Sequence, residues 1–408
     1  MKKFTLMFSA CLIPVACAGL SGCLTADADI YGQEKVLEYV DSVCSEPYEL
    51  VGKELIQETP DNMEYEFRTL NRDLTFHANS YLSPIQIDAS VTSFYSRSLS
   101  CDYVNTVLNQ YRDQVGVVLE QDSHYLSDYG WYYLSEFQDI NGAVDTLLAA
   151  DQIYRPELAY NNADFLRENP VSSIHVVWQA SEEAAAAHEH WVNLTDIAVT
   201  GQNEEAEIFD RLADVYAQMS VDGKIPSDGI PEEYLKGKHV SRLDTILLDG
   251  RELFYDSEDN PYGPYGLTTD DYRFCWYSSE LDSYMLIMDI GFLSDSTSFP
   301  LIIREYVRAL GGSYRASSED SFYTSSWTID DSSWSLEAVY EDSAIENLRI
   351  EKNGKELPVS WVTCEEDSHV NATFCVGVTA GDFCRLFDLE YRVNEQAGIL
   401  AFESFRKP

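Results

Sequence analysis

The sequence predicts an α+β protein made of several small units, each an antiparallel sheet packed with one or two helices. Apolar residues recur at helical spacing in a few separate segments, and short stretches with β-sheet preference lie between them. Turn residues separate neighbouring β stretches, as in antiparallel hairpins. The chain is 45% hydrophobic and 13% aromatic, which is enough for ordinary cores and unlike a disordered chain.

The first predicted unit covers residues 33–168. Apolar residues at helical spacing, among them Val36 and Val40, predict a helix over residues 34–44. Pro60-Asp61-Asn62 predicts a turn between the first two strands. The predicted strands are residues 48–56, 64–70, 74–81 and 85–98, and the further helical segments are residues 104–118, 140–150 and 159–167. This order of elements resembles that of small cystatin-like or PepSY-like modules of exported bacterial proteins.

The second predicted unit covers residues 169–293. It begins at Asn169-Pro170, because a residue that precedes proline is disfavoured in a helix. Residues 191–197 fit either a strand or the continuation of a helix. Asp249-Gly250 predicts a tight hairpin turn. The remaining predicted elements are a helix over residues 204–219, a loop over 256–266, and strands over 173–179, 240–248, 272–278 and 284–290.

The third predicted unit covers residues 294–408. A helix that begins near residue 299 is expected to end at Gly311-Gly312, where glycine suits the C-cap. Asn353-Gly354 predicts a second tight hairpin. The other predicted elements are strands around residue 327 and over 334–340, 348–352, 374–378, 391–393 and 399–402, and a helix over 381–387.

Three short motifs in this third unit are arranged as in a known family. They are Pro300-Leu301, Ala309-Leu310-Gly311 and Asn353-Gly354-Lys355. Their order resembles the paired repeats of copper amine oxidase N-terminal-like (stalk) domains of exported Gram-positive proteins. The second repeat lacks the proline and the Trp-Asp pair of that family. The resemblance implies a stalk-like α+β repeat domain and no copper site.

The N-terminal segment has the features of a secretory signal peptide. Lys2 and Lys3 precede an apolar run over residues 4–18, and small residues follow. Leu20-Ser21-Gly22-Cys23 resembles the lipobox of bacterial lipoproteins. The resemblance implies that residues 1–22 are removed and that Cys23 is diacylated, with palmitate as the kind of acyl chain, on the extracytoplasmic face of the cell membrane. Residues 23–32 would then be a tether, and the alternative is an ordinary signal peptide in which Cys23 has no role.

The charge of the chain excludes two classes of partner. The chain has 70 acidic and 27 basic residues, which gives a formal net charge of −43. The acidic residues are spread along the chain, so we expect a solvated acidic coat. Such a surface repels nucleic acids and anionic lipid headgroups, and the sequence has no basic patch that would offset it.

Six of the nine cysteines remain after the signal segment and Cys23 are set aside. An exported protein can keep disulfides, and we predict that Cys44 lies near Cys101 and that Cys364 lies near Cys375. Six cysteines allow fifteen pairings, and free buried thiols are the alternative. None of these cysteines forms a C-x-x-C motif, so neither a zinc ribbon nor a thioredoxin-like site is predicted.

No recognisable catalytic or metal-binding motif occurs in the chain. His188-Glu189-His190 has the wrong spacing for a zinc-peptidase helix, and we interpret it as a polar edge. The acidic run that begins at Asp256 lacks the glycine and glutamate of an EF-hand, since it has Pro261 and Leu267 in their places. We therefore predict no catalytic residue, no metal site and no cofactor, although a hydrolase whose active site has no sequence signature remains an alternative.

The most suggestive surface feature is a loop rich in proline and glycine. It carries Tyr262 and Tyr265 and lies near Trp276 in the sequence. Restrained tyrosine rings can present flat surfaces to a protein or a sugar, although packing against the core edge is the alternative. The sequence thus predicts a lipid-anchored cell-surface protein that acts as a binding or interaction module, with a protein or cell-wall glycan partner.

Overall fold

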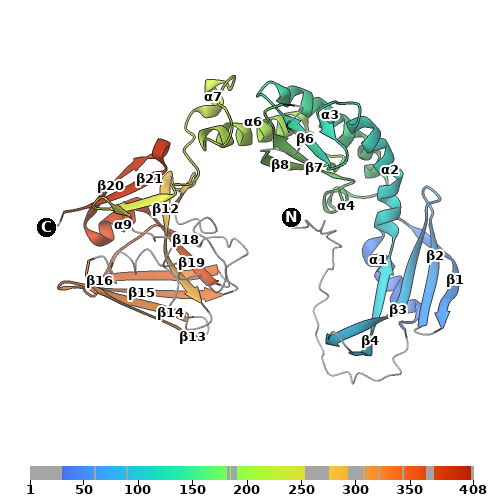
Figure 1. Cartoon of the computed structure of the whole chain (residues 1–408). Coiled ribbons are helices and arrows are strands. Elements are labelled where there is room, and N and C mark those ends of the chain that lie inside the picture. The colour runs from blue at the N-terminus through green and yellow to red at the C-terminus, as the bar shows by residue number, and fades with distance from the viewer. Residues whose placement is uncertain are drawn as a thin grey trace. The chain divides into compact units, whose positions relative to one another are not determined.

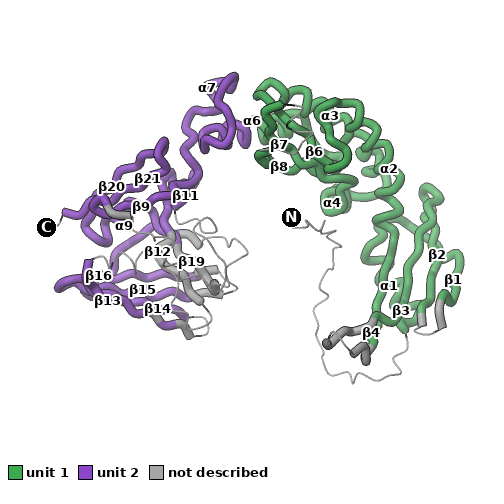
Figure 2. The backbone as a smooth tube through the Cα atoms, in the orientation of Figure 1, with its two compact units in different colours: residues 1–212 green, residues 213–408 purple. Residues whose placement is uncertain are grey.

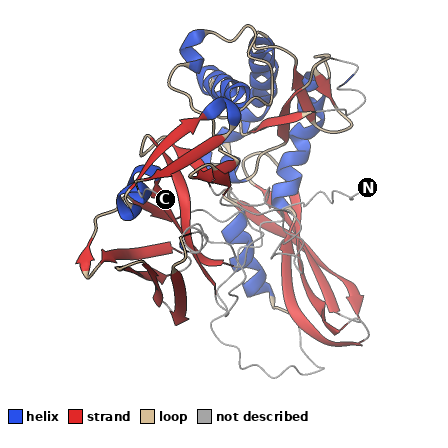
Figure 3. Cartoon of the chain, turned by 60° about the vertical axis from the view of Figure 1, so that its left-hand side comes forward, coloured by secondary structure: helices blue, strands red, loops and turns tan. Residues whose placement is uncertain are grey.

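The computed structural model describes residues 30–58, 61–88, 91–181, 184, 191–252, 275–292, 307, 310–319, 322–341, 344–363 and 372–405. The chain forms two compact units, residues 1–212 and residues 213–408 (Figures 1 and 2). Several small sheets are packed with helices, so the predicted α+β class is confirmed (Figure 3). No helix within the described ranges has the length and apolar character that crossing a bilayer requires.

The first sheet of unit 1 is an antiparallel meander, as expected, in the order β1-β2-β3-β4. Its third strand continues to Asp88 and so includes the start of the strand predicted over residues 85–98, because its pairing with β4 continues past Tyr81. Phe67 and Phe76 are fully buried and stacked, with ring centroids 5.3 Å apart. Tyr103 meets Phe76 edge to face at 5.1 Å, which joins the following helix to the sheet. The elements are α1 (Gln33–Val43), β1 (Tyr48–Glu58), β2 (Asp61–Thr69), β3 (Thr75–Asp88), β4 (Val91–Cys101) and α2 (Tyr103–Leu119).

The second sheet of unit 1 has the order β5-β6-β7-β8 and contains one parallel pair, β6 with β7. Parallel neighbours need a long connection, and here the chain between them forms helices. The strand alternative for residues 191–197 is confirmed as β8. The elements are β5 (Tyr125–Leu126), β6 (Trp131–Leu134), α3 (Asp139–Tyr154), η1 (Arg155–Ala159), α4 (Ala163–Glu168), β7 (Ser173–Trp178) and β8 (Val192–Ala198).

A buried polar cluster joins the meander to the helices of unit 1. Arg72 lies 2.6 Å from Glu46 and 2.5 Å from Glu157, and both glutamate side chains are fully buried. Tyr103 donates to Glu46 and Tyr111 donates to Glu157, each at 2.7 Å. Buried carboxylates require this degree of pairing, because a lone charge inside a protein is strongly unfavourable. The cluster therefore fixes how the two sheets of unit 1 are connected.

A second buried carboxylate, that of Asp151 on α3, holds the turn after β8. It accepts hydrogen bonds from the backbone N–H groups of Thr200 and Gly201 at 2.8 Å and of Asn203 at 3.0 Å. Gly201 has a φ of +71°, and a Cβ there would lie 2.9 Å from the backbone nitrogen of Arg155. Only glycine combines an unstrained positive φ with the absence of a Cβ atom, so only glycine fits at this position.

Helix α6 (Glu205–Val221) contains the division between the units, and unit 2 follows with three sheets. Their orders are β10-β9-β21-β20, β11-β12-β19-β18 and β13-β14-β15-β16-β17. The elements are α7 (Glu232–Leu235), β9 (Thr245–Leu248), β10 (Arg251–Glu252), β11 (Cys275–Ser278), β12 (Ser283–Phe292), β13 (Ser313–Glu319), β14 (Phe322–Ile329), β15 (Ser332–Glu341), β16 (Ala344–Lys352), β17 (Lys355–Glu356), β18 (Trp361–Thr363), β19 (Ala372–Thr379), α9 (Ala380–Phe387), β20 (Leu389–Asn394), η4 (Glu395–Ala397) and β21 (Ile399–Ser404).

Helix α9 lies at the centre of the unit 2 core. Trp327 and Trp334 are buried and stacked at 6.2 Å, and Phe387 of α9 packs against both. The two predicted hairpins are confirmed. Asp249-Gly250 and Asn353-Gly354 each have positive φ at both turn positions, as a tight two-residue hairpin requires.

The two compact units differ from the three domains predicted from the sequence. The predicted boundary at 168/169 falls within the second sheet of unit 1, because β6 pairs with β7 across it. The predicted boundary at 293/294 falls within a sheet of unit 2, because β12 pairs with β19. Strand pairing between segments far apart in the sequence has no local signal. The helix predicted from residue 299 lies largely outside the described residues.

Candidate functional site

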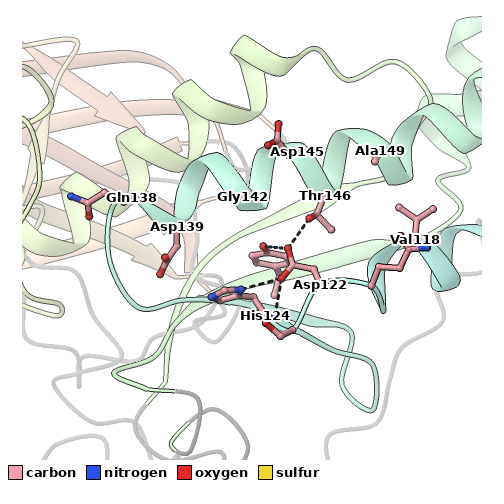
Figure 4. A pocket seen from close by; sticks show the side chains of 12 residues that line it. Val118, Asp122, His124, Gln138, Asp139, Gly142, Asp145, Thr146 and Ala149 are labelled. Carbon is pink, nitrogen blue, oxygen red and sulfur yellow. Dashed lines mark hydrogen bonds and ion pairs between the residues drawn. The ribbon is translucent and has the colours of Figure 1, made fainter.

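A pocket of about 640 Å³ lies in unit 1 where the end of α2, the segment before β5 and one side of α3 meet (Figure 4). Most of the residues that line it have polar side chains, and none of them is a lysine or an arginine. The lining residues are Val118, Gln121, Asp122, Ser123, His124, Tyr132, Gln138, Asp139, Gly142, Asp145, Thr146 and Ala149.

Asp122 is the centre of the hydrogen bonds in this pocket (Figure 4). Tyr132 on β6 and Thr146 on α3 donate to its Oδ2 atom at 2.6 and 2.7 Å. The backbone N–H of His124 donates to Oδ1 at 2.9 Å. The carboxylate therefore ties the segment before β5 to both the sheet and the helix, and its position is well defined.

These contacts keep Asp122 ionised. Burial raises the pKa of the Asp122 carboxyl, but the hydrogen bonds from Tyr132, the His124 backbone and Thr146 outweigh it and lower the pKa to about 2. The pocket therefore holds a fixed negative charge at any physiological pH.

The imidazole of His124 is held by the same carboxylate. Its Nδ1 atom lies 3.0 Å from Oδ1 of Asp122, and its ring packs on Tyr133 with centroids 4.8 Å apart. The side chain is 35% exposed, so the ring is oriented and still reachable from solvent. Among the described residues, no hydrogen bond joins His124 to a serine, threonine or cysteine side chain, although a histidine-activated nucleophile requires one.

Two more aspartates add to the negative charge of the pocket. Asp139 caps the turn before α3, because its Oδ2 atom accepts the N–H groups of Ser135 and Glu136. Asp145 is exposed on α3. With three carboxylates and no lysine or arginine in the lining, the pocket favours a positively charged ligand over an anionic one.

A cluster in unit 2 also combines a histidine with a carboxylate. Nδ1 of His239 lies 2.7 Å from Oε1 of Glu395, and Tyr284 donates to the same atom at 2.9 Å. Burial raises the pKa of Glu395, but the hydrogen bonds from His239 and Tyr284 lower it below its ordinary value. The cluster fastens the segment before β9 to η4, so we assign it a structural role.

Most of the residues singled out in the sequence lie outside the described residues. These are Cys23, His188-Glu189-His190, Tyr262, Tyr265 and Cys364, so the lipid anchor, the polar edge and the contact loop remain predictions. Trp276 is described. It lies half-buried in β11 and forms an isolated bridge with Arg242.

Cys44 and Cys101, which are predicted to lie near one another, are both free thiols in the structure. Burial raises the pKa of Cys44 to about 11 and that of Cys101 to about 12, so both thiols are protonated and unreactive at neutral pH. Cys375 lies in β19 opposite Ile290, and its partner Cys364 is outside the described residues, so this second pair stays a prediction.

The chain matches no protein family, no curated protein sequence and no solved structure. Within the described residues, no group of three or more histidine, cysteine, aspartate or glutamate side chains is placed to hold a metal ion.

Proposed function

We propose that this protein is a lipid-anchored binding protein of the extracytoplasmic cell surface, and that the pocket around Asp122 is its ligand site. The ligand is a small molecule with a cationic amine. The observation that supports this most is the Asp122 carboxylate, which is held in place and ionised by Tyr132 of β6, by Thr146 of α3 and by two contacts from the neighbouring His124. A preorganised charge binds with little cost of ordering.

The sequence supports the location in this proposal. The lipobox-like residues that end at Cys23 follow a signal-like segment and would place the folded chain outside the cytoplasm. The lack of a catalytic motif, and of a nucleophile bonded to His124 among the described residues, favours binding over turnover.

Isothermal titration of the full chain tests the pocket with organic amines such as putrescine and spermidine. Uncharged and anionic molecules of similar size serve as comparison ligands. We expect binding of amines only, and we expect Asp145→Asn to weaken it about fivefold, since one nearby charge in solvent is worth about 1 kcal/mol.

The matched control is Asp113→Asn, which makes the same charge change on α2 at an exposed position outside the pocket lining. It should leave amine affinity unchanged. Equal loss in both variants, or equal binding of anionic ligands, would contradict the proposal. Chemical conversion of a bound ligand would favour the hydrolase alternative instead.

A further inference from the structure

The second sheet of unit 1 has an aromatic surface on one face. In β6, Trp131 pairs with His175 of β7, and His175 pairs with Asp196 of β8. Directly paired residues point to the same side of a sheet, so these three side chains share one face. Leu126 of β5 pairs with Trp131, so its side chain lies on the same face. The opposite face carries Tyr132, Leu134, Ile174 and Val176 and is buried toward the helices.

Three rings lie side by side on this face. The Trp131 ring lies 4.9 Å from that of Trp191 with a 50° tilt, and 5.7 Å from that of Tyr129 with a 45° tilt. Tyr129 is 52% exposed and Trp191 is 44% exposed. We call these three rings the aromatic surface. Adjacent exposed aromatic rings are unusual on a soluble protein and indicate a contact site.

The aromatic surface adjoins a small buried core on the same face of the sheet. Tyr133 and Val177 are 4% and 1% exposed, and Leu126 and Trp131 pack against them. Tyr133 and Val177 lie on the same face as Trp131, so Trp131 is held from the side by this small core, and the rings of its two neighbours pack on it. Rings ordered in the free protein lose little conformational entropy when a partner binds.

Polar groups lie beside the rings on the same face. Nδ1 of His175 is 2.7 Å from Oδ1 of Asp196, and both side chains are about half exposed. The carboxylate has lone pairs left to accept hydrogen bonds from hydroxyl groups. An apolar ring surface bordered by such acceptors suits a molecule with a flat C–H face and a rim of hydroxyls.

From this arrangement we propose that the aromatic surface binds a neutral oligosaccharide. The C–H groups on one face of a pyranose ring carry partial positive charge, which the negative face of an aromatic ring attracts. Stacked rings also bind single-stranded nucleic acid, but that needs a cationic groove, whereas this chain has 70 acidic residues and 27 basic ones. The same charge disfavours anionic polysaccharides. This site is separate from the amine pocket and does not depend on it.

Titration of the full chain with cellohexaose and chitohexaose, followed by tryptophan fluorescence and calorimetry, tests this inference. We expect binding of at least one neutral hexasaccharide and none of heparin. Trp191→Ala and Tyr129→Ala should each weaken binding about tenfold, and the double variant should bind too weakly to detect.

Two controls make the test specific. Tyr391→Ala removes a 40% exposed ring from β20 in unit 2, and Asp145→Asn alters the amine pocket. Both should keep the wild-type affinity for the sugar, and an unchanged melting temperature shows that each variant is folded. Absence of binding to any neutral hexasaccharide at millimolar concentration overturns the inference, as does equal binding of heparin or equal loss in the Tyr391 variant. Capture of a protein partner without sugar binding overturns it as well.

Discussion

At the scale of single residues, unit 1 depends on buried carboxylates whose partners come from distant parts of the chain. Glu46 and Glu157 share Arg72, and Asp151 accepts three backbone N–H groups. Asp122 is partly buried, and it faces a pocket. It therefore links stability and binding, because the hydrogen bonds that hold it in place also keep it charged.

The stability of the protein should depend on Asp122 in a defined pH window. Its pKa is lowered from 3.8 to about 2 in the folded chain. A carboxyl with a depressed pKa stabilises the fold above its ordinary pKa, and this contribution is lost as the pH falls toward the folded value. We expect Asp122→Asn to lower the free energy of unfolding by about 1–2 kcal/mol at pH 7. This loss should become progressively smaller between pH 4 and pH 2.

Urea unfolding across this pH range measures the effect. Asp113→Asn is the control, because Asp113 is exposed on α2. A difference between Asp122→Asn and the wild type that stays constant from pH 7 to pH 2 would show that the charge of Asp122 is not what stabilises the fold.

At the scale of elements, the turn after β8 is where α3 and the second sheet of unit 1 meet. Asp151 of α3 binds the turn through its carboxylate, and Gly201 lets the turn approach the backbone of residues 154–155 closely. The turn thus fixes the position of the sheet whose other face carries the aromatic surface. Close backbone contact of this kind allows very little relaxation.

Gly201→Ala should therefore lower the free energy of unfolding by more than an alanine with positive φ usually does. Its Cβ would meet Arg155 N at 2.9 Å, whereas Gly130, with a similar φ of +68°, has nothing within 4 Å of the added Cβ. We expect Gly130→Ala to lower the free energy of unfolding by about 1 kcal/mol and Gly201→Ala by about 3 kcal/mol or more. Denaturant titration of the two variants compares them directly, and equal losses would refute the steric argument.

At the scale of the whole molecule, the protein consists of two compact units with an acidic composition. Both proposed binding sites lie in unit 1. Unit 2 has its own core, in which Trp327 and Trp334 pack against α9. The proposed location of the whole chain depends on its N-terminal segment.

Replacement of Cys23 tests the lipid anchor. Because the sequence after residue 23 contains no apolar run of about 20 residues, Cys23→Ala should move the protein from the membrane fraction to the soluble fraction. Cys101→Ala is the control, and it should leave the protein with the membranes. Fractionation followed by immunoblotting shows the distribution, and a Cys23 variant that remains firmly membrane-bound would exclude lipid anchoring.

Local patterns in the sequence predicted most of the individual elements. Apolar stripes located α1, α2 and α3, and β-favouring stretches located the first two strands of the meander, but the predicted break between the third and fourth strands was several residues too early. Asp249-Gly250 and Asn353-Gly354 located two hairpins, because positive φ at both positions favours those residue types. Helix capping, periodicity and turn chemistry act over a few residues, so a single sequence contains them.

Contacts between distant segments could be identified only from the tertiary structure. Asp122-Ser123-His124 can be read directly from the sequence. No local sequence pattern, however, indicates that the side chains of Tyr132 and Thr146 donate hydrogen bonds to the Asp122 carboxylate. The aromatic surface likewise depends on the register that places Trp131 beside Trp191, from segments sixty residues apart. Composition and periodicity thus determined the fold class and the elements. Strand pairing and burial, which depend on the whole chain, decided the two units, the pocket and the aromatic surface.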